Sequence, residues 1–154
     1  MNKSSFVYVI YIRTTLEKLW DALLKPEFTR TYWFGVTQES AWTPGASWRM
    51  VLPDGTTADT GEILEIEKPK YLVIRWRNEF RPELKEEGYS ICRIELEQAE
   101  GGAVRLSIRH EIDKPGAKLI DAVSGGWPKV LSSLKSLLES GAPLGEIGGH
   151  GKPK

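Results

Sequence analysis

Alternation of apolar and polar residues predicts most of the strands in this chain of 154 residues. Residues 6–12 are rich in β-branched and aromatic side chains and are predicted to form the first strand. Residues 89–98 and 103–112 alternate regularly and are joined by Glu100-Gly101-Gly102. That arrangement is typical of a β-hairpin.

Turn signals predict further strands between residues 44 and 76. Pro44-Gly45, Asp54-Gly55 and Lys68-Pro69-Lys70 each favour a turn, and apolar runs lie between them. Residues 78–88 are polar and charged and are predicted to form an exposed loop. The chain is therefore expected to contain about six antiparallel strands in addition to the first.

Two short helices are predicted directly after the first strand. Thr14 with Glu17 three residues later forms a capping box, and apolar residues follow at helical spacing. Pro26 ends this helix and begins the next, which Gly35 closes.

A long C-terminal helix is predicted to end near Glu139. Its apolar residues keep a period of 3.6 across Gly125-Gly126-Trp127-Pro128, which indicates one continuous helix. Pro128 has no N–H to donate to the carbonyl of Ser124, so a bend is expected there. Residues 142–154 are rich in glycine and proline, and we expect a flexible tail.

This order of elements predicts an α+β fold in a single domain spanning residues 1–141. The long helix buries its apolar stripe on an antiparallel sheet. Strand alternation places mostly apolar side chains on the face that meets the helix, together with ionisable Glu62 and His110. Trp127 lies on the inner stripe of the helix and should project between helix and sheet. The residues expected to line a cavity there are Trp33, Trp48, Met50, Glu62, Trp76, His110 and Trp127.

Each of these candidates has two interpretations. His110 could act as a general base or contact a ligand, or it could be a polar residue hydrogen-bonded at the end of its strand. Glu62 could be a buried acid/base, or it could pair with an arginine or lie at the exposed end of its strand. The tryptophans could surround a ligand or simply fill the core.

Composition restricts the function further. Lys+Arg and Asp+Glu both total 21, and the net charge of zero argues against a nucleic-acid partner. No run reaches the roughly 18 apolar residues of a membrane span. The one cysteine, Cys92, fits a reducing cytoplasm, where we expect the protein to reside. No nucleotide motif or Cys/His cluster appears, so we expect no cofactor and no metal.

Three segments resemble, in order, the activator of heat shock protein 90 ATPase homologue-like family. They are FVYVIYIRTTLEKLWDALLKPEFTRTYWFG, PGASWRMVLPDGTTADTGEILEIEKPKYLVIRW and GGWPKVLSSLKSLLES. The family belongs to the START/polyketide-cyclase/birch-pollen-allergen-like superfamily. The resemblance implies a helix-grip fold, in which a curved antiparallel sheet of about six to seven strands surrounds the C-terminal helix and encloses a cavity.

Three functions are compatible with the sequence. The first is a protein that binds a small hydrophobic or aromatic ligand in the cavity, in a stress-response role. The second is a cyclase- or hydrolase-type enzyme that uses His110 and Glu62. The third is a chaperone accessory or protein-interaction module. Zero net charge gives little electrostatic resistance to self-association, and family members of this size are often dimers, so we also expect a homodimer.

Overall fold

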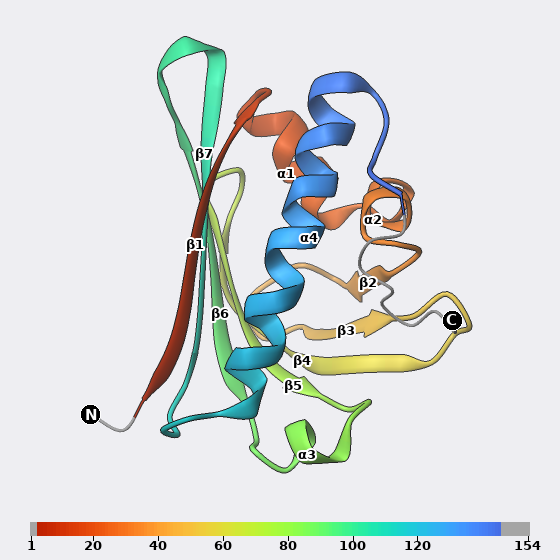
Figure 1. Cartoon of the computed structure of the whole chain (residues 1–154), viewed down its shortest axis with the longest axis vertical. Coiled ribbons are helices and arrows are strands. Elements are labelled where there is room, and N and C mark those ends of the chain that lie inside the picture. The colour runs from red at the N-terminus through yellow and green to blue at the C-terminus, as the bar shows by residue number, and fades with distance from the viewer. Residues whose placement is uncertain (1–2, 146–154) are drawn as a thin grey trace.

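A seven-stranded antiparallel sheet curves around one long helix in the computed structural model, which describes residues 3–145 (Figure 1). The strand order is β1-β7-β6-β5-β4-β3-β2, so β1 and β2 form the two edges. In chain order the elements are β1 Ser4–Arg13, α1 Leu16–Leu24, α2 Pro26–Tyr32, β2 Thr37–Ser40, β3 Ser47–Val51, β4 Thr57–Glu67, β5 Tyr71–Asn78, α3 Pro82–Lys85, β6 Ser90–Gln98, a short 3-10 turn Glu100–Gly102, β7 Ala103–Ile112 and α4 Lys118–Ser140. The predicted α+β helix-grip fold is confirmed.

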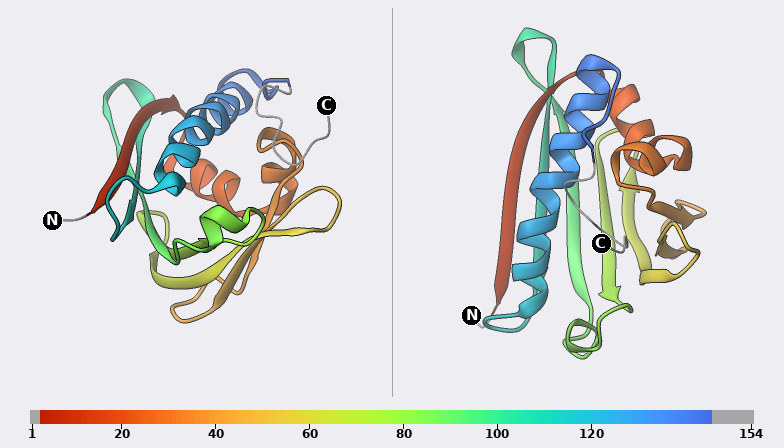
Figure 2. Two further views of the ribbon diagram at one scale, coloured as in Figure 1. Left: turned by 60° about the horizontal axis from the view of Figure 1, so that its bottom comes forward. Right: turned by 45° about the vertical axis from the view of Figure 1, so that its right-hand side comes forward.

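The helices lie inside the curve of the sheet. Figure 2 shows α4 running along the hollow of the sheet, with α1 and α2 beside it. The core fills the space between these layers and includes side chains that are fully shielded from solvent, such as Ile108 of β7 and Leu131 of α4. Burying a side chain of this kind stabilises the fold by roughly 1.5–3 kcal/mol.

The continuous C-terminal helix predicted across Pro128 is confirmed, because α4 extends without interruption over Lys118–Ser140. Its first turn is capped from another segment: the carboxylate of Glu87 accepts from the backbone N–H groups of Lys118 and Leu119 at 2.8 and 2.9 Å. This arrangement satisfies two N–H groups that a helix start leaves without partners. No helix within residues 3–145 is both long and apolar enough to cross a membrane.

Two local predictions need correction. The first helix is capped by Thr15, whose Oγ1 accepts from the backbone N–H of Lys18, and not by Thr14. Residues 78–88 are not simply an exposed loop, because α3 lies within them. Leu84 of α3 is buried in a small apolar cluster with Leu119 of α4, which anchors this segment beside the helix.

A register shift in β4 overturns the predicted orientation of Glu62. The pairing of β4 with β5 shifts between Ile63 and Glu65, and Gly61 and Ile63 lie opposite the buried Trp76 and Ile74. Directly opposed residues on paired strands share a face, so Gly61 and Ile63 point toward the helix. Glu62 points to the outer face, because successive side chains alternate.

The predicted tail covers residues 142–154. Residues 146–154 lie outside the described part of the chain, and residues 142–145 have no regular secondary structure. Gly141, where we propose that the domain ends, is the C-cap of α4: it has a φ of +88° and its N–H donates to the carbonyl of Leu137. Glycine adopts this left-handed conformation without strain, which explains why the helix stops there.

Candidate functional site

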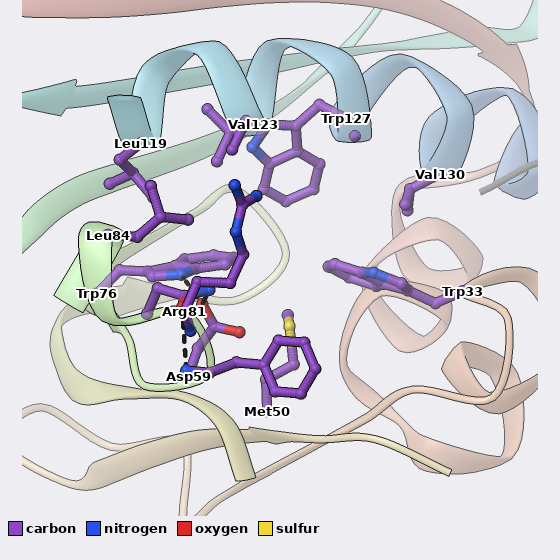
Figure 3. A pocket seen from close by; sticks show the side chains of 14 residues that line it. Trp33, Met50, Asp59, Trp76, Arg81, Leu84, Leu119, Val123, Trp127 and Val130 are labelled. Atoms are coloured by element: carbon purple, nitrogen blue, oxygen red, sulfur yellow. Dashed lines mark hydrogen bonds between the residues drawn. The ribbon is translucent and has the colours of Figure 1, made fainter. Parts of the chain in front are cut away.

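A cavity of about 220 Å³ lies between α4 and the concave face of the sheet (Figure 3). Its walls come from α4, from strands β3 to β5, from the end of α2 and from the segment that includes α3. The lining is mainly apolar. The residues around it are Trp33, Met50, Asp59, Trp76, Asn78, Phe80, Arg81, Leu84, Leu119, Ala122, Val123, Gly126, Trp127 and Val130.

Three tryptophans dominate the cavity wall. The ring of Trp127, on α4, lies 5.5 Å from the ring of Trp33 and 5.9 Å from the ring of Trp76, measured between centroids. Behind them, Trp48 packs on Trp76 at 4.7 Å. Tilted and edge-on arrangements at these separations are favourable for aromatic pairs. The indoles therefore support one another and present a rigid aromatic surface to the cavity.

The glycines of α4 leave space beside Trp127. Apart from the two adjacent residues and the backbone of α4 itself, a methyl group built on either Gly125 or Gly126 would meet no atom within 4 Å. Gly126 lies on the cavity wall, whereas Gly125 is exposed. No close approach of protein backbone requires these glycines, and the missing side chain at position 126 keeps that part of the cavity open.

One buried carboxyl group lies on the cavity wall. Asp59 of β4 is only 4% exposed, and its Oδ2 accepts from Trp76 Nε1 at 2.7 Å and from Asn78 Nδ2 at 3.4 Å. Burial raises the pKa of Asp59 to about 6, against the lowering effect of these two hydrogen bonds. Because this pKa is still below 7, the carboxyl group of Asp59 is mainly ionised at neutral pH, although it lies among aromatic rings.

His110 of β7 lies behind Trp76, with a ring separation of 5.0 Å, and is fully buried. Its Nε2 is 2.8 Å from Ser90 Oγ, which donates to the carbonyl of Trp76, and its Nδ1 accepts from Trp127 Nε1 at 3.4 Å. This pattern assigns the neutral tautomer with hydrogen on Nε2. Burial lowers the pKa of His110 to about 3, so the ring stays uncharged near neutral pH. Both of its nitrogens are engaged within the protein.

The structure separates the seven predicted candidates into three groups. Trp33, Met50, Trp76 and Trp127 lie on the cavity wall. Trp48 and His110 are buried behind that wall. Glu62 lies on the outer face with 43% of its side chain exposed, 3.8 Å from Arg75. Of the alternative interpretations of Glu62, the structure supports the pairing with an arginine; Glu62 lies within β4 and not at its end.

Asp59 is the functional candidate that the sequence analysis missed. It lies in the polar stretch TTADTG, which resembles an extended turn. Asp59 is two residues from Gly61 and shares its face, but only the pairing of Gly61 with Trp76 shows that this face is the inner one. Within residues 3–145, no group of three or more His, Cys, Asp or Glu side chains is placed to hold a metal ion.

Residues 13–139 match the model of the family described as Activator of Hsp90 ATPase homolog 1-like protein. No curated protein sequence matches the chain. Solved structures do resemble it. One is a protein from Mesorhizobium loti, with a TM-score of 0.74 and 21% identity over 88% of this chain and 97% of that one.

Two further solved structures also resemble the chain. The Aha1 dimer from Colwellia psychrerythraea has a TM-score of 0.70 and 16% identity over 90% of this chain and 98% of that one. An Hsp90 activator from Plasmodium falciparum has a TM-score of 0.70 and 20% identity over 87% and 95% of the two chains. At these identities the likeness establishes the fold alone.

Proposed function

This chain belongs to the Activator of Hsp90 ATPase homolog 1-like family, and we propose that it binds a small apolar or aromatic molecule in the cavity between α4 and the sheet. The observation that carries the proposal is the aromatic wall formed by Trp33, Trp76 and Trp127. A mainly apolar pocket with a few polar groups is typical of small-molecule sites. Phe80 and Arg81, both about half exposed, mark the mouth.

The volume limits the size of the ligand. An apolar cavity of roughly 150 Å³ is large enough for benzene, and ligand pockets for drug-sized molecules begin near 300 Å³. A cavity of about 220 Å³ therefore suits a molecule with one or two aromatic rings. Steroids and long lipids would need substantial rearrangement of α4.

The enzyme hypothesis based on His110 and Glu62 receives no support from the geometry. The two side chains lie on opposite faces of the sheet, and the nitrogens of His110 are already hydrogen-bonded. A general base must reach the proton that it removes. A binding role agrees better with this arrangement. A stress-response role and a cytoplasmic location, which family membership and the single cysteine suggest, complete the proposal.

The glycines of α4 offer a matched test of cavity binding. Gly126→Leu should fill the cavity and abolish binding of toluene and naphthalene. Binding would be measured from the shifts of the indole N–H resonances of Trp76 and Trp127 during a titration. Gly125→Leu, one residue away but exposed, should bind both probes as the unmodified protein does. Neither variant should be less stable, because glycine is about 1 kcal/mol less favourable than other residues inside a helix. Equal binding by both variants, or no saturable binding to the unmodified protein, would contradict the proposal.

We further propose that the protein forms a homodimer through the outer face of β1. This edge strand exposes three apolar side chains, Val7, Val9 and Tyr11, and a structural relative was solved as a dimer. Light scattering at micromolar concentration should give about twice the chain mass of 17.3 kDa. Val9→Lys should give the monomer mass, since the interface would then bury an unpaired charge among apolar side chains. Leu64→Lys, at an exposed apolar site on β4, is the control and should remain dimeric. A monomeric unmodified protein would refute this assembly.

A further inference from the structure

Asp59 presents an unused oxygen to the cavity. Both of its side-chain hydrogen bonds, from Trp76 and Asn78, converge on Oδ2. Within residues 3–145, no side chain donates to Oδ1. The carboxyl group lies on the cavity wall beside the indole of Trp76 (Figure 3). The site therefore holds one free acceptor, aimed at the space that a ligand would fill.

The charge of Asp59 also lacks a counterion. In the described part of the chain, no lysine, arginine or histidine nitrogen lies within 4.0 Å of its carboxylate, and the nearby cations have other partners: Arg77 contacts Glu79 at 2.7 Å and Arg81 contacts Glu83 at 2.8 Å. A buried charge is normally paired, because taking it out of water is costly. The fold itself gives no compensating cation for this group.

We propose that the cavity selects a small aromatic molecule that carries a protonated amine, with the ammonium group on Asp59 Oδ1 and the ring among the cavity tryptophans. The inference rests on the proposed function and specifies its ligand class. An ammonium ion supplies both features that Asp59 lacks, a hydrogen-bond donor for Oδ1 and a positive charge. The faces of neighbouring indoles add attraction for a cation, and the cavity volume accommodates one ring with a short side chain.

The charged surroundings of Asp59 determine how binding depends on pH. Glu79, at the end of β5, raises the pKa of Asp59 in addition to burial. His110 on β7 stays neutral. Arg81, which also lines the cavity, pairs with Glu83 at 2.8 Å, and α4 adds no charged side chain to the lining. Because the pKa of Asp59 is about 6, lowering the pH from 7 to 5 protonates it and should weaken binding of the amine.

A series of probes with one ring and one two-carbon chain tests the proposal. Phenethylamine and 2-phenylethanol end this chain with an ammonium and a hydroxyl group, and ethylbenzene has the same ring and chain with no polar group. Titrations of the full chain would follow the indole N–H resonance of Trp76, which is bonded to Asp59. We expect phenethylamine to bind about tenfold or more tightly than ethylbenzene at pH 7, and to lose that advantage at pH 5.

Asp59→Asn is the decisive variant. The amide can still accept from Trp76 and Asn78 but carries no charge, so the variant should fold, with a melting temperature equal to or above that of the unmodified protein. Phenethylamine affinity should fall about tenfold or more and lose its pH dependence, while ethylbenzene affinity should be unchanged. Glu62→Gln, the same chemical change on the outer face of β4, should leave all three affinities unchanged.

The outcomes separate this inference from the proposed function. If no probe of the series binds, the cavity function itself fails. If ethylbenzene or 2-phenylethanol binds as tightly as phenethylamine, or if Asp59→Asn leaves phenethylamine affinity unchanged, the amine preference is wrong and the apolar binding site stands.

Discussion

Gly61→Ala should destabilise the protein by at least about 4 kcal/mol, which is a large part of the 5–15 kcal/mol that typically separates folded from unfolded domains. A Cβ at this position would lie 1.6 Å from the carbonyl oxygen and 2.7 Å from the carbonyl carbon of Arg75. Both atoms belong to the backbone of β5, so no side-chain rotation can relieve the overlap. The strands would have to separate, with loss of hydrogen bonds at the centre of the sheet.

The position of Gly61 also links this residue to the site. It lies opposite Trp48 on β3 and opposite Trp76 on β5. Since Gly61 places no side chain between them, the two indoles approach to 4.7 Å. Any Gly61→Ala protein that remains folded should therefore have a displaced Trp76, a changed near-UV circular dichroism spectrum and weakened binding of apolar probes.

Urea denaturation would measure the effect of Gly61→Ala. Gly125→Ala is the matched control, because a methyl group there meets nothing within 4 Å and should stabilise α4 by up to about 1 kcal/mol. If the free energy of unfolding of Gly61→Ala lies within about 1 kcal/mol of that of the unmodified protein, β4 and β5 do not approach each other as closely as the distance of 1.6 Å requires.

Regular periodicity explains which parts of the fold could be predicted. The alternation in β6 and β7 and the 3.6 spacing in α4 each report a local property, the face that a side chain occupies. Those predictions are confirmed for Cys92 and His110, which are fully buried, and for Trp127 on the inner side of α4. The predicted N-cap, Thr14, is wrong by one residue, because the spacing of apolar residues does not define exactly where α1 begins after β1.

Prediction failed where distant contacts override the local pattern. The polar segment around Leu84 gives no sign of burial by itself, because its partner Leu119 is 35 positions away in the chain. The shift of register in β4 breaks the period of two, so counting along the strand placed Glu62 inside and left Asp59 unrecognised. The aromatic part of the site could thus be predicted from residue type, whereas its charged group required the pairing of β4 with β5.

Trp127→Ala should destabilise the protein by about 3 kcal/mol and change which molecules bind. Truncating a buried tryptophan typically costs about 3–5 kcal/mol, and the lower end applies here because one side of the ring already borders a cavity. The variant removes the ring contacts with Trp33 and Trp76 and leaves His110 Nδ1 without its donor. An unsatisfied buried acceptor accounts for part of the loss.

The enlarged cavity distinguishes a wall residue from an ordinary core residue. Trp127→Ala should bind naphthalene more tightly relative to toluene than the unmodified protein does, since the removed indole leaves space for a second ring. Trp127→Phe is the control: it keeps an aromatic ring on the wall but has no N–H for His110, so it should show a smaller loss of stability and little change in preference. Because Trp127 lies on α4 and contacts both the end of α2 and strand β5, an alanine variant with unchanged melting temperature and unchanged probe preference would remove the physical basis for a ligand site between helix and sheet.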